Sequence, residues 1–559
     1  MRRIARSPFW LFLLLTLVVT WPLAANATRS LASDYGDPLF GAWLIGRVAG
    51  QMTRIAGGDL AAIATFWDAN IFYPEPNTLA FAEHLIGETV QVLPIYWATG
   101  NLLLCYNVAL LLSFVLCGFG TYLLVADLTG SAIGGLAAGV FFAFTEYRLS
   151  YELSHLQTLS NHWLPFALLG IHRYITRGSR LALAGAVAAI VALNLSAGFH
   201  MLYGGPVIAA FAVAELAWTG KAREARTWLW LGITAAIVAV CTAPFVLPYV
   251  AMRRQLHFQR PLEEVIRFSA TLDQYRAALP GFSVPLLLAL AAIVAACKTA
   301  DTLQKVTASS RRALVAAAAI GLLLTFWLSL GPVIQQGGRA LPIPGLYRVL
   351  YDYVPGYDGI RAVGRMATLF FFFLAVLAGI GIAAIESRSA RAATVTAVIA
   401  CVLFLWQTRP SPFPLDREWP FVSPGLAAVP AYLHPAPQPP QVYRFVSALD
   451  PRAVLVEFPF GDNAYNLRYM YFSSAHGKRM LAGYSGVFPE SYLARQRALQ
   501  EPLAQPDAAW TALAGATYAI VHAGGWPNDT GDRIARWLRD RGAREAGHFD
   551  GARVFELKR

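Results

Sequence analysis

Two carboxylates, Asp34 and Asp37, follow closely after the first long apolar run of the chain, which covers 9–25. The run is uncharged and is preceded by three arginines. Because basic flanks of a span stay on the cytoplasmic side, both carboxylates are expected on the opposite face of a membrane. A positioned carboxylate can take the proton of a hydroxyl group as its oxygen attacks an electrophilic carbon, which is worth roughly 10²–10⁴-fold in rate. The sequence therefore predicts acid–base chemistry at a membrane surface.

Asp37 also fits a structural role. It directly precedes Pro38, and helices commonly begin with an acidic residue and carry proline in their first turn. A helix cap and a general base can be the same residue, so both interpretations stay open.

The elements that must position these carboxylates are membrane spans. Of 559 residues, 56% are hydrophobic and 14% are charged, which is too apolar for a soluble protein of this length. We predict a polytopic α-helical membrane protein whose spans each approach the roughly 20 residues that cross a bilayer. About eleven spans are expected, near 9–25, 102–126, 131–146, 158–174, 181–197, 199–218, 228–250, 281–297, 313–331, 367–385 and 392–407.

The connecting segments alternate in basic charge, which predicts the orientation of the chain. The basic, cytoplasmic loops carry Arg173, Arg177, Arg180, Lys221, Arg223, Arg226, Lys298, Lys305, Arg311, Arg312, Arg388 and Arg391. The long outer loops are 26–101, 147–157, 251–280, 332–366 and everything after Gln407. The amino terminus is therefore expected in the cytoplasm and the tail outside it. Residues 1–27 also resemble a secretory signal peptide, but the charge-free run is long for one, so we expect an uncleaved anchor.

The net charge of +12 raises the question of nucleic-acid binding. Much of the basic excess lies in the predicted cytoplasmic loops, where anionic lipid headgroups are the expected partner, so we predict no nucleic acid. No nucleotide-binding loop and no serine-hydrolase elbow is present in the sequence. The cysteines all fall within predicted spans and form no metal-binding spacing: Cys105, Cys117, Cys241, Cys297 and Cys401.

Three regions follow from these patterns. They are a transmembrane module of 1–407 with the first outer loop 26–101, a Pro-rich linker of 408–440, and an exoplasmic α/β domain of 441–559. In the first outer loop, 39–55 has helical apolar spacing and should lie along the membrane surface, and 79–97 is a second surface segment. In the tail, apolar runs predict strands at 453–458, 517–522 and 553–557 and a helix at 532–541.

Four segments carry a resemblance to a known family. They are Gly36-Asp37-Pro38-Leu39, Phe66-Trp67-Asp68-Ala69-Asn70-Ile71-Phe72-Tyr73-Pro74, Ala82-Glu83-His84-Leu85 and His155-Leu156-Gln157. With the span architecture, they resemble the GT-C superfamily of membrane glycosyltransferases, and most closely a group of uncharacterised bacterial GT-C-like proteins. The resemblance covers about 9–407. It implies a bacterial inner (plasma) membrane protein that uses a polyprenyl-phosphate-linked sugar at the periplasmic face.

The resemblance also implies roles for the outer carboxylates. Asp37 is the first choice for the general base and Asp34 the second. Asp68 and Asn70 could bind sugar hydroxyls or, joined by other acids, a divalent cation, but a simple turn is the alternative. The cofactor is therefore unknown, with a divalent cation as one possibility. Glu83 and His84 could assist acid–base chemistry or hold a phosphate, with a plain surface pair as the alternative.

Further candidates come from other outer segments. His155 and Gln157 could line the same cavity. A leaving phosphate needs cations, and Arg361 and Arg365 stand near the membrane edge, where an arginine fork can bind phosphate or merely extend toward headgroups. The alternatives are Arg253, Arg254, Arg260 and Arg267. In the tail, the aromatic segment 483–489 could stack on sugar rings, dock the domain onto the membrane part, or simply pack in a core.

Together these observations predict an inverting glycosyltransferase that moves a sugar from a polyprenyl-phosphate carrier to an exoplasmic lipid, glycan or protein. The first alternative is a non-catalytic transporter or flippase of lipid-linked sugars, which predicts polar residues deep inside several spans. The second is a membrane-assembly factor, which would tolerate loss of Asp34 and Asp37 but would fail without its tail.

Overall fold

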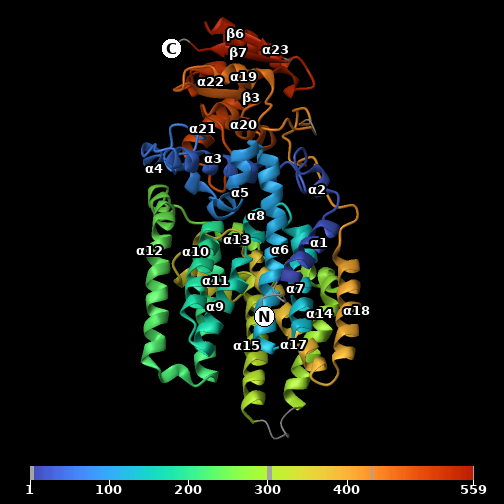
Figure 1. The fold of residues 1–559 in the computed structure, drawn as a ribbon. Helices are drawn as coiled ribbons and strands as arrows, with labels where there is room; N and C mark the ends of the chain where they lie inside the picture. Colours follow the sequence, from blue (N-terminus) through green and yellow to red (C-terminus); the bar gives the residue numbers. More distant parts are fainter. Residues whose placement is uncertain (1–5, 299–304, 430–431, 550, 558–559) are drawn as a thin grey trace.

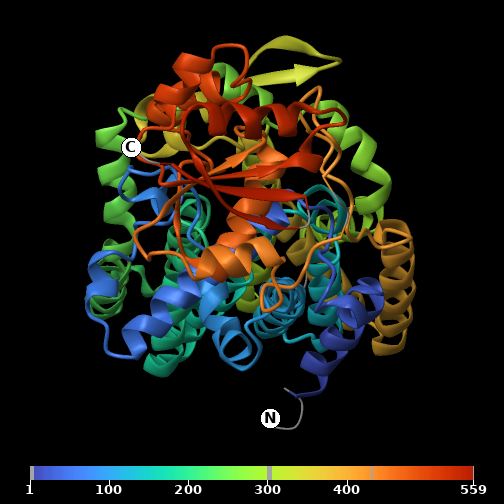
Figure 2. The same ribbon diagram turned by 90° about the horizontal axis from the view of Figure 1, so that it is seen from above.

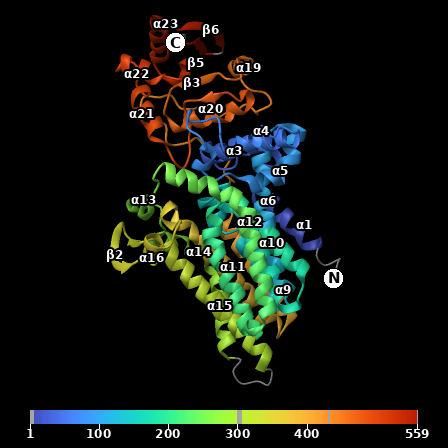
Figure 3. The same ribbon diagram turned by 90° about the vertical axis from the view of Figure 1, so that its left-hand side faces the viewer.

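The computed structural model describes residues 6–298, 305–429, 432–549 and 551–557. Long helices form a bundle in one half of the molecule, and a small α/β domain lies at one end of it (Figure 1). Short helices of the first outer loop are placed between the two, as the side view in Figure 3 shows. Any site between bundle and domain is therefore bordered by the first outer loop.

Each predicted span contains a helix. The helices are α1 (Arg6–Val19), α6 (Leu102–Thr129), α7 (Ala132–Ala143), α9 (Trp163–Arg177), α10 (Arg180–Ser196), α11 (Phe199–Trp218), α12 (Ala225–Gln255), α14 (Leu272–Lys298), α15 (Lys305–Ser329), α17 (Ala367–Glu386) and α18 (Ala390–Thr408). Within the described ranges, seven stretches are long and apolar enough to cross a membrane, on α6, α11, α12, α14, α15, α17 and α18. The chain is thus a helical protein with seven candidate membrane spans, fewer than the sequence predicted.

The difference is clearest at the predicted third and fourth spans. Their helices, α7 and α9, have only 12 and 15 residues, fewer than the roughly 20 that cross a bilayer. Between them the chain forms a π-helical turn, η2 (Tyr147–Tyr151), and the short helix α8 (Leu156–Leu159). The loop therefore includes the last residues of the predicted third span and the first residues of the predicted fourth span.

The predicted basic loops and the predicted outer loops lie at opposite ends of the bundle. In Figure 1 the connections from α11 to α12 and from α17 to α18 lie at the lower end, while the first outer loop and the tail lie at the upper end. Lys221 donates a hydrogen bond to the carbonyl of Ile175, so the turn after α9 and the turn after α11 are neighbours. This arrangement matches the alternation expected from the charges.

The first outer loop contains α2 (Leu23–Asn26), α3 (Asp37–Ala56), α4 (Ala61–Ala64), η1 (Thr78–Phe81) and α5 (Ile86–Thr99). The helix expected at 39–55 is present as α3, but protein rather than lipid covers its apolar face. Trp43 is buried and donates a hydrogen bond to Ser473 of the tail at 3.2 Å, and Gly41 packs against Tyr106 of α6. The apolar stripe of α3 therefore packs against the tail domain and α6, and its position along the membrane surface stays a prediction.

The C-terminal domain is built on a mixed five-stranded sheet in the order β4-β3-β5-β7-β6. Strands β3 (Val454–Phe458), β4 (Arg479–Met480) and β5 (Tyr518–His522) are parallel, and β6 (Arg544–Phe549) and β7 (Ala552–Glu556) are antiparallel. The predicted strands correspond to β3, β5 and β7. The helices are α19 (Gln441–Ser447), α20 (Asn463–His476), α21 (Glu490–Leu499), α22 (Pro506–Ala512) and α23 (Thr530–Asp540), the last being the predicted one.

The Pro-rich linker runs alongside the residues that lead into α3. Its backbone forms isolated bridges that join Leu415 to Ala32 and Arg417 to Asp34. Gly36 lies so close to the linker that a Cβ atom there would be 1.6 Å from the ring of Trp419. The linker therefore holds the start of α3 in place, and only glycine fits at this contact.

The remaining outer segments surround the same end of the bundle. They are α13 (Leu262–Arg267), β1 (Val333–Gln336), β2 (Arg339–Pro344), α16 (Tyr347–Tyr353), η5 (Tyr357–Gly359) and η6 (Val363–Met366). Seen from above in Figure 2, the β1–β2 hairpin projects at the edge of the molecule. The segment η5–η6 runs directly into α17 and carries the predicted arginines.

Candidate active site

Asp37 is the first residue of α3, where the helix dipole favours a negative charge. The hydroxyl of Tyr484 donates a hydrogen bond to its Oδ1 at 2.9 Å, and His155 Nε2 lies 3.1 Å from Oδ2. Burial by itself raises the pKa of Asp37, but the contacts with His155 and Tyr484 and the nearby charge of Arg365 outweigh it and lower the pKa to about 2. The carboxylate therefore stays ionised at neutral pH and faces its partners from two domains.

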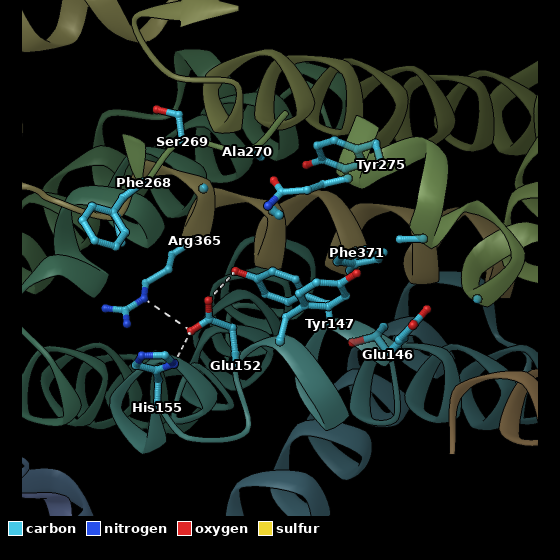
Figure 4. Close-up of a pocket in the computed structure, with 18 of the residues that line it drawn as sticks. Glu146, Tyr147, Glu152, His155, Phe268, Ser269, Ala270, Tyr275, Arg365 and Phe371 are labelled. Atoms are coloured by element: carbon cyan, nitrogen blue, oxygen red, sulfur yellow. Dashed lines mark hydrogen bonds and ion pairs between the residues drawn. The ribbon is translucent and has the colours of Figure 1, made fainter. Parts of the chain in front are cut away.

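His155 lies between two carboxylates. Its Nδ1 is 3.3 Å from Oε2 of Glu152, and the same oxygen is 3.3 Å from Nε of Arg365. Tyr147 donates a hydrogen bond to the other oxygen of Glu152 at 3.2 Å. Figure 4 shows these contacts as a continuous chain from Arg365 through Glu152 to His155. Asp37 extends this chain, so a charge that develops at one end acts on the other.

A buried arginine holds the loop that carries Glu152 and His155. Arg148 is 1% exposed, donates hydrogen bonds to Asn161 at 2.8 Å and to the carbonyl of Leu159 at 2.9 Å, and lies over the rings of Phe114 and Phe142. Burying a cation is favourable only when it is well hydrogen-bonded, and here these groups meet that need without a carboxylate. The loop after α7 is thereby fixed against α6.

A cavity of about 210 Å³ opens beside Asp37. Two carboxylates and three guanidinium groups line it, together with aromatic side chains and the tail segment 484–487. The charged and polar lining residues are Asp37, Glu83, Gln157, Tyr203, Tyr249, Arg260, Arg361, Arg365, Tyr484 and Ser485. We call this space the central cavity. Its composition suits an anion held by arginines next to a carboxylate base.

A second cavity, of about 290 Å³, lies on the other side of His155 and Glu152 (Figure 4). Arg361, Ala362 and Arg365 border both spaces. Aromatic and amide groups dominate the rest of its wall: Tyr147, Tyr151, Phe268, Gln274, Tyr275 and Phe371. We call it the lateral cavity. The chain of contacts from Arg365 to Asp37 thus separates two spaces that can each hold a ligand.

A third space is an elongated groove of about 1070 Å³ along the outer ends of α11 and α12. It shares Glu83, Phe199 and Tyr249 with the central cavity, so the two are continuous. Most of its lining is apolar, with Met201, Leu202, Phe245, Val246 and Val250 among the lining residues, and Arg253, Arg254 and His257 also border it. The mostly apolar lining suits a hydrocarbon chain, and the residues shared with the central cavity place the two spaces side by side.

Glu83 stands at the junction of the central cavity and the groove. Its Oε2 accepts a hydrogen bond from the backbone N–H of Gly198 at 2.7 Å. Burial raises the pKa of Glu83 to about 7, although that hydrogen bond and Arg365 oppose the shift. Its neighbour His84 is 1% exposed and borders only the groove, and burial lowers the pKa of His84 to about 3, so the imidazole is neutral. The two residues therefore differ in surroundings and charge despite their adjacency.

Asp34 lies close to the site but does not line its cavities. Its carboxylate accepts hydrogen bonds from Ser33 at 2.9 Å, from Ser154 at 2.7 Å and from the backbone N–H of Gly36 at 2.8 Å. These contacts join the entry to α3 with the loop of His155. Of the two carboxylates that follow the first apolar run, Asp37 lines the central cavity and Asp34 joins two loops beside it.

Asp68 and Asn70 are placed away from the cavities. Asp68 is exposed and accepts a hydrogen bond from the backbone N–H of Asn77 at 2.8 Å, as a turn residue does. Asn70 donates to the carbonyl of Lys478 at 3.0 Å and so docks the tail. Gln157 lines the central cavity, and its backbone carbonyl oxygen lies 2.7 Å from His200 Nε2. Among the residues described, no cluster of three or more acidic, histidine or cysteine side chains could hold a metal ion.

For three residues of the site, the contacts found in the structure were not predicted from the sequence. Glu152 contacts both His155 and Arg365. The one sequence feature that could have indicated this role is its position three residues before His155 in a short outer loop. Arg260 was an alternative and lines the central cavity. Tyr484 lay in the aromatic tail segment, and its contact with Asp37 spans 447 positions, which no local pattern reveals.

Comparison with known proteins supports the assignment of the fold. No protein-family model and no curated protein sequence matches the chain. The structure of the arabinofuranosyltransferase AftD from mycobacteria matches 100% of this chain and 40% of that one, with a TM-score of 0.62 and 13% identity. A variant of AftD matches with a TM-score of 0.59 and 15% identity. ArnT from Cupriavidus metallidurans bound to undecaprenyl phosphate matches 98% of this chain and 97% of that one at 13% identity, with a TM-score of only 0.41.

These comparisons define a class of fold. The resemblance to GT-C membrane glycosyltransferases, predicted from the sequence, is confirmed as structural similarity over the whole chain at low sequence identity. This chain spans about 40% of the length of the AftD chain that it matches.

Proposed function

We propose that this protein is an inverting glycosyltransferase that moves a sugar from a polyprenyl-phosphate carrier to an acceptor outside the cytoplasm. One observation carries the proposal: the Asp37 carboxylate and three arginines face a single cavity that continues into an apolar groove along α11 and α12. A lipid-linked anionic donor needs both a cationic pocket and a hydrocarbon site. The acceptor hydroxyl needs a base beside it as its oxygen approaches the reacting carbon.

The donor would bind across the central cavity and the groove. Arg260, Arg361 and Arg365 can hold the phosphate by charge-assisted hydrogen bonds, and the isoprenoid chain would occupy the groove. Arg361 lies over the ring of Phe268, a residue of the lateral cavity, and so stands at the border between the two cavities. AftD is an arabinofuranosyltransferase, and the similarity of its fold to this chain supports the class of reaction.

The reaction would be an in-line displacement. The acceptor oxygen forms a bond to the anomeric carbon, and the bond from that carbon to the phosphate oxygen breaks, so the phosphate leaves with the electron pair. The hydroxyl proton passes to Asp37, while the arginines stabilise the charge that develops on the phosphate. Attack opposite to the leaving group inverts the anomeric centre.

The low pKa of Asp37 fits this role once a donor is bound. The contacts with His155 and Tyr484 lower the pKa of Asp37 more than the charge of Arg365 does, and an anionic phosphate beside Arg365 would offset only this last and smallest influence, so donor binding raises the basicity of the carboxylate to a limited extent. The lateral cavity, on the far side of His155, would hold the part of the acceptor remote from its reacting hydroxyl, which itself must reach Asp37 in the central cavity. Its aromatic and amide lining suits the faces and hydroxyls of a glycan.

The orientation of the chain supports an exoplasmic reaction. The basic loops lie at the end of the bundle opposite to Asp37, and loops rich in Lys and Arg stay in the cytoplasm. The site would then face the periplasm of a bacterial inner membrane.

The test is sugar transfer in proteoliposomes that contain the full chain, a panel of radiolabelled polyprenyl-phosphate sugars and cell-envelope extract as the acceptor source. Asp37→Asn should lower transfer by roughly 10²–10⁴-fold with donor binding retained. Asp34→Asn, the matched control, should have a smaller effect because its carboxylate only orders the loop. Unchanged transfer by Asp37→Asn would refute the assignment of the base. Movement of lipid-linked sugar across the bilayer without transfer to any acceptor would favour a transporter instead.

A further inference from the structure

The tail contributes one wall of the central cavity. Tyr484, Ser485, Gly486 and Val487, in the segment between β4 and α21, all line it. We call this segment, 483–487, the roof segment. The charged residues of the cavity come from the first outer loop and from the outer segments around α13 and η5–η6, so the roof segment is the contribution of a separate domain to the site.

The roof segment is held firmly on its own domain. Asn466 of α20 donates a hydrogen bond to the carbonyl of Gly483 at 3.0 Å, and the N–H of Tyr484 lies 3.1 Å from the sulfur of Met470. A Cβ atom on Gly483 would be 2.7 Å from the ring of Phe72, so the first outer loop packs directly against it. The segment therefore presents a fixed backbone to the cavity.

The membrane half holds it from the other side. Arg260 donates a hydrogen bond to the carbonyl of Gly486 at 2.5 Å, and Tyr484 donates to Asp37. The ring of Tyr484 also packs edge-on against Phe40 with centroids 5.4 Å apart. The roof segment is thus coupled to the base through Tyr484 and to a phosphate-binding arginine through Gly486.

One polar group of the roof segment has no partner. Ser485 is 5% exposed, and its hydroxyl makes no hydrogen bond to any residue in the described part of the chain. A buried hydroxyl without a partner costs free energy, so an unpaired group of this kind calls for an explanation. Because Ser485 lines the cavity next to Asp37 and Tyr484, a ligand in the cavity is placed to satisfy it.

We infer that the roof segment recognises the transferred sugar, with the Ser485 hydroxyl bonded to one sugar hydroxyl and Tyr484 positioning Asp37 above the anomeric carbon. This inference rests on the proposed function and adds to it the residues that select the sugar. A hydroxyl that both donates and accepts hydrogen bonds matches the hydroxyl groups of a carbohydrate. In the proposed function the three arginines bind the lipid phosphate and the groove binds the isoprenoid chain, so the sugar is the part of the donor left for Ser485.

The first test is binding to the full chain in nanodiscs. The probes are a polyprenyl-phosphate sugar that the wild type transfers and the same polyprenyl phosphate without sugar. Ser485→Ala should weaken binding of the sugar-bearing lipid by roughly 2- to 12-fold, the range of one neutral hydrogen bond, and leave binding of the bare lipid unchanged. Equal effects on both lipids, or no effect on either, would overturn the inference.

The second test identifies the hydroxyl that Ser485 contacts. Deoxy analogues of the donor, one for each sugar hydroxyl, are compared in wild type and Ser485→Ala. One analogue should lose affinity for the wild type but bind wild type and Ser485→Ala equally well, because the partner group is missing in both. If every analogue shows the same ratio between the two proteins, Ser485 contacts no sugar hydroxyl.

Tyr484→Phe separates positioning from folding. It removes the hydrogen bond that lowers the pKa of Asp37, so the acid limb of the pH–rate profile should move to higher pH while the KM for donor changes little. The matched control is Tyr465→Phe, the same change on α20, whose hydroxyl bonds to the carbonyl of Ala427 away from the cavity. Loss of transfer with an unmoved pH profile would overturn the positioning role. Absence of transfer by the wild type from any donor would instead refute the proposed function, and this inference with it.

Discussion

Donor binding should weaken as the pH rises through neutrality, because Glu83 loses its proton there. Its pKa is raised to about 7, and it stands where the central cavity meets the groove, close to the arginines that would hold the phosphate. An ionised Glu83 repels an anionic headgroup, whereas a protonated one can donate a hydrogen bond to a phosphate oxygen. The charged and titratable groups that influence it are Arg365, Glu88, Tyr203 and Tyr249.

The size of the effect follows from the protonated fraction. If only the protonated form binds, the apparent Kd is the intrinsic Kd divided by that fraction. With a pKa of about 7, the Kd should rise about 2-fold at pH 7 and about 11-fold at pH 8, relative to pH 5. Glu83→Gln resembles the protonated form, so its Kd should be nearly constant over the same range.

The assay is equilibrium binding of a polyprenyl-phosphate sugar to the protein in nanodiscs from pH 5 to 8.5. A Glu83→Gln variant with the same pH slope as the wild type would refute the reasoning, because the slope would belong to another group. Stability gives an independent check. A raised pKa means that the folded state retains a proton that the unfolded state releases, so the wild type loses stability as pH rises from 4.5 to about 7. Glu83→Gln should therefore have a higher Tm than the wild type at pH 8 and not at pH 4.

Three further substitutions test other parts of the structure. Arg365→Ala should weaken donor binding roughly 10- to 150-fold, the range for a hydrogen bond to a charged group, and Arg365→Lys should recover part of this loss in the same binding assay. Gly36→Val should lower the Tm because its side chain overlaps the ring of Trp419, and adding Trp419→Ala should restore part of the loss; a loss that is simply additive would contradict the contact. Leu202→Trp should fill the groove and weaken binding of a long-chain donor but not of a short-chain, water-soluble analogue; equal binding of both would place the chain elsewhere.

Hydropathy and charge predicted where the helices lie and which loops share one end of the bundle, because both patterns depend on whether a segment faces lipid or water. Each apolar run became a helix, and the basic loops and outer loops lie at opposite ends, as alternation requires. Helix length was harder to predict. The loop predicted at 147–157 is longer in the structure, because α7 ends at Ala143 and α9 begins at Trp163. Phe144 and Leu159 were counted into the predicted spans, since an apolar residue buried in protein has the same hydropathy as one that faces lipid. The apolar face of α3 was assigned to lipid for the same reason, since a helix side covered by another helix has the same composition.

The sequence predicted which residues could belong to the site, but not which of them contact one another. Asp37, Glu83, Arg361 and Arg365 were placed on the outer face by topology, and all four line the central cavity. Which groups touch is decided by contacts between distant segments, such as that of Asp37 with Tyr484. A sequence read without relatives gives no information on such pairs.

The contact between Asp37 and Tyr484 also sets the order in which the site can be completed during synthesis. Asp37 precedes Tyr484 by 447 positions, so Asp37 leaves the ribosome before Tyr484, which emerges only after the helices of the bundle. A nascent chain, or one truncated before Tyr484, can insert its helices and still lack the roof of its central cavity. Under the proposed function, a carrier lipid would therefore meet a complete site only after the α/β domain has crossed the membrane and folded.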